Sequence, residues 1–309
     1  MSKENTAVTK KKIKRCKEDV VFDAACFIIL TLVLFVVAYP LYWVIISSIS
    51  APSAVSSGKV LLHPIGFTLK GYAEVFKNDQ VMRGFLNSLI ITFCGVMVNL
   101  IVTLPTSYAL SRSNFSGKKP ITIFYLITMF FGGGLIPTYL VIQRLQMLNT
   151  IWALILPGCL SVYNMIVART FFKSNISEEL YEAAEIDGCT QARFFFQIAL
   201  PLSKAIIAIL VLYYGVGHWN SYFSALVYIS DKAKYPLQLV LRNILITNQT
   251  ALSQTATTAA ARAALQEKQQ LIDVMKYSLI IISSIPVLVM YPLVQKHFVK
   301  GVMSGSIKG

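Results

Sequence analysis

The stretch that decides the fold reads Glu182-Ala183-Ala184, then Gly188, then Ile198-Ala199-Leu200-Pro201. It lies between two apolar runs, at about 151–172 and 202–228, and each run is long enough to cross a bilayer. A polar segment between two such runs cannot remain in hydrocarbon. The sequence therefore predicts a short structured element at the membrane surface.

Local signals predict that this element is a helix-turn-helix. Ser177 can cap a first short helix, Glu178 and Glu179 favour the positive end of its dipole, and Ile176 can pack on Tyr181 as a hydrophobic staple. Gly188 supplies a left-handed stop. Thr190 can cap a second short helix that runs toward the next apolar run.

The spacing of the fixed residues resembles the EAA motif of permease subunits of ABC importers, and every fixed position matches. In that family the first short helix is the coupling helix, which sits in a groove of a cytoplasmic ATPase. An amphipathic interfacial hairpin is the alternative, but all the fixed positions would then have to coincide. The resemblance implies that the ATPase-coupling residues are Leu180, Glu182, Ala183, Ala184, Asp187 and Gly188.

The resemblance covers nearly the whole chain, from about 21 to 309, and favours the carbohydrate branch. The chain is most similar to permeases of complex-carbohydrate and oligosaccharide importers, relatives of the second, six-helix membrane subunit of the maltose importer. Relatives commonly carry a proline before the coupling helix, where this chain has Asn175-Ile176-Ser177. Further matching segments are Gly66-Phe67-Thr68-Leu69, Asn87-Ser88-Leu89, Tyr108-Ala109-Leu110-Ser111-Arg112, the segment from Phe131 to Tyr139, and Trp219-Asn220.

Composition indicates a multispan membrane protein, since 55% of the 309 residues are hydrophobic and only 14% are charged. Six apolar runs predict six spans, and the resemblance implies the all-α, polytopic type I ABC importer (MetI-like) permease fold. The runs lie at about 21–49, 85–110, 121–142, 151–172, 202–228 and 277–294.

The expected organisation has three parts, with both termini in the cytoplasm and the chain in the cell membrane. Residues 1–19 form a basic N-terminal segment, 20–300 form the permease domain with its coupling hairpin at 174–201, and 301–309 form a flexible tail. The net charge of +14 arises largely from basic residues that flank the apolar runs, so it indicates topology rather than nucleic-acid binding.

Polar and aromatic side chains in the spans are candidates for a sugar pathway, because sugars need amide or hydroxyl partners and an aromatic face. The alternative is hydrogen bonding between helices, which is favoured for Asn87 and Asn99. The candidate pathway residues are Tyr139, Asn164, Trp219, Asn220 and Tyr222.

Three consecutive glycines, Gly132 to Gly134, precede Pro137 and should break the third span. The freed backbone would then belong to a gate or a cavity wall. Close helix packing through small residues is the alternative. Arg169, near the inner end of its span, is expected to extend toward the interface.

Motifs for catalysis are absent from the sequence, so the chain is not expected to be an enzyme. The nearest approach to a phosphate-binding loop, Ser116-Gly117-Lys118-Lys119, lacks the first glycine and the hydroxyl. The five cysteines show no metal-ligand spacing, and neither a metal site nor a disulfide is expected. No cofactor should bind this chain, and ATP with magnesium would bind the partner ATPase.

These features predict a permease subunit that imports an oligosaccharide or complex glycan. The expected partners are a second homologous permease, two ATPase subunits and an extracellular sugar-binding protein, and the resemblance favours a heterodimer. A stand-alone secondary transporter or channel for a polar solute is the alternative. It would require coupled ionisable groups at mid-membrane, and the spans offer few. Neither the glycan nor the identity of the partners can be read from the sequence.

Overall fold

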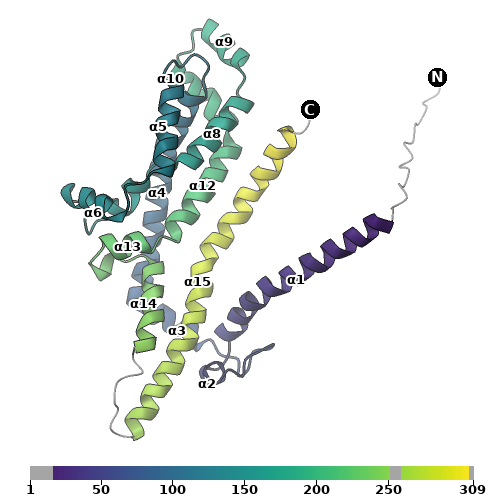
Figure 1. Ribbon diagram of the computed structural model, residues 1–309. Helices are drawn as coiled ribbons and strands as arrows, with labels where there is room; N and C mark the ends of the chain where they lie inside the picture. The colour runs from purple at the N-terminus through teal and green to yellow at the C-terminus, as the bar shows by residue number, and fades with distance from the viewer. Residues whose placement is uncertain (1–16, 251–258, 306–309) are drawn as a thin grey trace.

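The computed structural model describes residues 17–250 and 259–305, and within these ranges it contains helices and no strand (Figure 1). This confirms the all-α fold class. The elements are α1 (Lys17–Ser48), α2 (Pro52–Ser56), α3 (Lys70–Lys77), α4 (Asp79–Ser111), α5 (Lys118–Phe130), α6 (Leu135–Arg144), α7 (Trp152–Ile155), η1 (Leu156–Gly158), α8 (Val162–Asn175), α9 (Glu178–Ile186), α10 (Gln191–Phe194), the π-helix η2 (Phe195–Ala199), α11 (Leu200–Leu202), α12 (Lys204–Trp219), α13 (Phe223–Tyr228), η3 (Lys232–Lys234), α14 (Leu237–Thr250) and α15 (Ala259–Gly305).

Three described helices are continuous and apolar enough to cross a membrane: α1, α4 and the part of α15 from Gln269 to Pro292. Three further spans arise if each bent pair of helices counts as one. The bends are 112° between α5 and α6, 52° between the α7–η1 segment and α8, and 80° between the segment Gln191–Leu202 and α12. Counted in this way, the described helices give up to six spans, which is the predicted number, and half of these are bent pairs.

Three of the predicted runs are not single continuous helices. The third run is interrupted between α5 and α6, as its glycines predicted, and Gly134 there adopts a φ of +85° that other residues rarely adopt. The fourth run is interrupted between η1 and α8. The fifth run ends at Trp219 instead of continuing to Tyr228, and α13 follows as a separate helix. Hydropathy averages over the polar Asn220-Ser221 pair, at which the helical hydrogen bonding stops.

The central helix of the bundle is α4, which packs against α8, α12 and α14. The C-terminal helix α15 packs against α12 and α14, and the short helices α2 and α3 also pack against it. By contrast α1 is exposed over most of its length and diverges from the bundle (Figure 1). Its last turns meet α15, where Trp43 lies edge-on to Tyr277 at 5.1 Å between ring centres.

The expected C-terminal tail is not a separate segment over its first residues. The helix α15 continues through Gly305, so the part from 301 to 305 is helical, while 306–309 lie outside the described residues. Most of the basic N-terminal segment, 1–16, also lies outside them.

The contact between α3 and α15 depends on Gly71. A Cβ added there would lie 2.5 Å from Ser278 Oγ and 2.8 Å from Val274 Cγ1, so the helices approach closely only because the side chain is absent. Gly71→Ala should therefore destabilise the protein by about 1–3 kcal/mol, measured as a lower thermal unfolding midpoint in detergent. The matched control is Gly217→Ala, whose Cβ would meet no atom within 4 Å. An equal response of the two variants would contradict close packing at Gly71.

Candidate functional site

The segment that carries the EAA pattern forms the predicted helix-turn-helix. Ser177 Oγ accepts a hydrogen bond from Leu180 N at 3.3 Å, and α9 begins there. Gly188 ends the turn with a φ of +76°. Thr190 Oγ1 accepts from Arg193 N at 3.3 Å, and α10 begins. These local predictions are confirmed, and we call residues 174–201 the coupling hairpin.

The inner face of the coupling hairpin is built into the bundle. Ile176 and Tyr181, the predicted staple, are both buried in one hydrophobic cluster with residues of α4, α8 and α12. The ring of Tyr181 lies edge-on to Phe194 at 5.3 Å, which joins the two short helices of the hairpin. A helix as short as α9 is marginal by itself, so this packing sets its position.

An ion pair fixes the start of the hairpin to the end of α4. Arg112 Nη2 lies 2.6 Å from Glu178 Oε2, and Ser113 N donates to Glu178 Oε1 at 3.1 Å. The guanidinium group also lies over the ring of Tyr181, 4.1 Å from its centre. The Arg112 side chain is only 8% exposed, so loss of its partner would leave a buried charge. Sequence reasoning had assigned Glu178 only to the helix dipole.

The outer face of α9 is free in this chain. Leu180, Glu182, Ala183, Asp187 and Gly188 are exposed, whereas Ala184 is half-buried and packs against the inner cluster. Five of the six proposed coupling residues thus face outward.

Sequence reasoning missed Ile186, which is 87% exposed. It lies three residues after Ala183 and six after Leu180, so the three side chains share a face of the helix. That spacing, in an otherwise acidic helix, is the signal that could have identified it. Together they form an apolar strip on the exposed face, next to the exposed carboxylates of the same helix.

The candidate pathway residues are not brought together. Trp219 is only 2% exposed, its Nε1 donates to Ser283 O at 2.8 Å, and its ring packs edge-on to Phe85. Its ring is thus buried between α4 and α15 in this structure, and its place in a sugar pathway stays a prediction. Tyr139 stacks on Tyr228 at 6.2 Å in another cluster.

The other three candidates lie at helix ends. Asn164 is buried in the first turn of α8, while Asn220 and Tyr222 are exposed between α12 and α13. The five pathway residues therefore stay a prediction.

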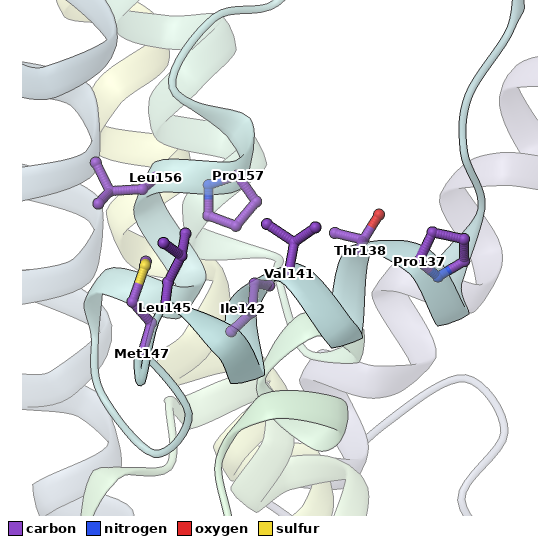
Figure 2. Close-up of a pocket in the computed structure, with 8 residues that line it drawn as sticks. All are labelled: Pro137, Thr138, Val141, Ile142, Leu145, Met147, Leu156 and Pro157. Atoms are coloured by element: carbon purple, nitrogen blue, oxygen red, sulfur yellow. The ribbon is translucent and has the colours of Figure 1, made fainter.

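The glycine break leads directly to an apolar groove. A Cβ added at Gly132 or Gly134 would meet no described atom of this chain within 4 Å, so close packing between its own described helices does not explain these glycines. Figure 2 shows side chains of α6 and η1 around a groove of about 400 Å³. Its lining residues are Pro137, Thr138, Val141, Ile142, Leu145, Met147, Leu156 and Pro157. The second half of the broken third span, α6, thus forms one side of this open groove.

Hydrogen bonds to other elements account for three further polar residues of the spans. Asn87 Nδ2 donates to Ala233 O at 2.8 Å, and Asn99 Nδ2 donates to Gly158 O at 2.7 Å. Arg169 Nε donates to Leu110 O at 2.9 Å, so its head group contacts α4 instead of simply extending to the interface.

Comparison with known proteins places these features in a family. No family model matches the chain. The chain is 36% identical over 288 residues to the polygalacturonan/rhamnogalacturonan transport system permease protein YtcP of Bacillus subtilis (strain 168), covering 93% of this chain and 98% of that protein. The chain belongs to the permeases of carbohydrate ABC importers. This permease is also 38% identical over 289 residues to protein LplC of the same organism, with 94% and 95% of the two chains covered.

A solved structure supports the same assignment. The permease matches a chain in the crystal structure of a bacterial ABC transporter involved in the import of the acidic polysaccharide alginate, with a TM-score of 0.82 and 27% identity. The match covers 93% of this permease and 99% of that chain. The permease is therefore a multi-pass membrane protein.

The ion pair at the start of the hairpin can be tested by hydrogen exchange. Glu178→Gln should raise the exchange rates of the α9 amides by about tenfold, because it weakens charge-assisted hydrogen bonds to Arg112 and Ser113. Glu179→Gln is the matched control, since Glu179 is exposed beside it. Equal exchange in the two variants would show that the ion pair does not hold the hairpin.

Proposed function

We propose that this permease moves an oligosaccharide or complex glycan into the cytoplasm as one membrane subunit of an ATP-driven importer. The carrying observation is the position of α9, which lies at one end of the bundle with its outer face exposed and its inner face fixed to α4 (Figure 1). A partner that binds the apolar strip of Leu180, Ala183 and Ile186 would act directly on the spans.

Movement of a partner bound to α9 would be passed to three helices. The chain enters the coupling hairpin from α8 and leaves it through an 80° bend into α12, and Arg112 ties α9 to α4. A displacement of the hairpin would therefore shift α4, α8 and α12. Energy for this movement would come from ATP hydrolysis on a separate ATPase.

The topology supports a cytoplasmic position for this end of the bundle. The first residues of α1 and the last residues of α15 lie toward the same end as α9 (Figure 1). Both termini would then face the cytoplasm with the hairpin, while α2 and α3 would lie outside and form an external cap. An extracellular sugar-binding protein would deliver the glycan on that side.

The assembly would contain a second homologous permease, two ATPase subunits and the sugar-binding protein, with two different permeases forming a heterodimer. The broad exposed surface of α1 and the open groove beside α6 provide apolar area for a membrane partner. Relatives named for polygalacturonan/rhamnogalacturonan transport and for alginate import support a glycan as the substrate.

Purification from gently solubilised membranes tests this function. The tagged permease should retain an ATPase and a second permease, identified by mass spectrometry. Ala183→Trp should lose the ATPase but keep the second permease, because the indole would prevent close approach to α9. Ala73→Trp, at an exposed alanine of the external α3, should keep both. A homogeneous homo-oligomer without ATPase, or normal ATPase binding by Ala183→Trp, would refute the assignment.

A further inference from the structure

The interruption of the fourth span is held by side chains from two other helices. Between η1 and α8 the helical hydrogen bonding stops, and in a membrane the freed groups need partners within the protein. Asn99 Nδ2 donates to Gly158 O at 2.7 Å, and Ser161 N donates to the Tyr214 hydroxyl at 3.2 Å. The partners come from α4 and α12, which lie against each other.

These side chains are also bonded to one another across the two helices. Asn99 and Thr103 are one turn apart on α4, and Tyr214 and His218 are one turn apart on α12. His218 Nε2 lies 2.6 Å from Asn99 Oδ1, and the Tyr214 hydroxyl lies 2.7 Å from Thr103 Oγ1. Because the Asn99 oxygen can only accept, the imidazole donates through Nε2. We call these four side chains the polar network.

A glycine makes room for the imidazole. A Cβ added at Gly95, one turn before Asn99, would lie 2.5 Å from His218 Nε2. Asn99 and Thr103 are fully buried, so water cannot readily replace a lost partner. The packing around the network thus selects one position for His218.

The three helices joined by the polar network are the three attached to the coupling hairpin. The hairpin follows α8, precedes α12 and is paired to the residue after α4 through Arg112. The network therefore connects the interrupted part of the fourth span to α4 and α12, the two helices that also adjoin the hairpin.

We propose that Asn99 and His218 are positioning residues that hold the interrupted fourth span on α4 and α12, so that these helices move with the hairpin as one body. The inference rests on the proposed function for its consequence, which is that hairpin movement reaches Gly158 and the adjoining groove. The hydrogen bonds themselves do not depend on that function.

Native Cys159, half-buried beside Gly158, reports on this site. In the assembled importer, with Cys16, Cys26, Cys94 and Cys189 replaced by alanine, maleimide labelling of Cys159 is followed with time. His218→Leu and Asn99→Leu should increase the labelling rate by about three- to tenfold. His218→Gln, whose amide can donate to Asn99, should restore much of the original rate. Gly95→Ala should increase labelling, and Gly217→Ala, next to His218 but in open space, should not.

A second measurement distinguishes positioning from general stability. The ratio of ATPase activity with and without the sugar-binding protein should fall in His218→Leu and recover in His218→Gln. Labelling at the original rate in both leucine variants would overturn the proposal, as would equal ATPase ratios in His218→Leu and His218→Gln. If no ATPase assembles with the permease, the proposed function fails, while labelling of the permease alone still decides whether the network holds the break.

Discussion

A backbone group freed inside a membrane must find a partner in the protein, because hydrocarbon offers none, and the structure depends on this constraint. Three of the six spans are bent pairs of helices. At the fourth span the partners are Asn99 and Tyr214, whose side chains reach across from α4 and α12. Asn99 and Tyr214 thus have a structural role that does not depend on transport.

The coupling hairpin also depends on side chains from other helices. Its two helices are too short to be stable alone, so they are held by buried aromatic rings and by Arg112. The inner face of α9 is buried by these contacts, and its outer face remains exposed and available to a partner. An element built in this way can pass a displacement to the spans because its own position is fixed to them.

Much of the hairpin could be predicted because its determinants are local. Ser177, Gly188 and Thr190 act on backbone within three residues of themselves, and the structure shows each in its expected place. Trp219 shows the opposite case: its aromatic ring suggested a sugar-binding surface, yet residues more than sixty positions later cover it. Hydropathy likewise indicated apolar runs, but it could not reveal that α6 turns by 112° from α5.

The sequence by itself determined the membrane class, the positions of the apolar runs, the helix caps and the glycine break, since these depend on composition and on neighbouring residues. Only the tertiary structure decided that Glu178 pairs with Arg112, that Ala184 faces inward and that Asn99 meets both His218 and Gly158. These contacts join residues far apart in the chain, and their geometry follows from how the helices pack. No periodicity within one helix encodes which distant side chain it will meet.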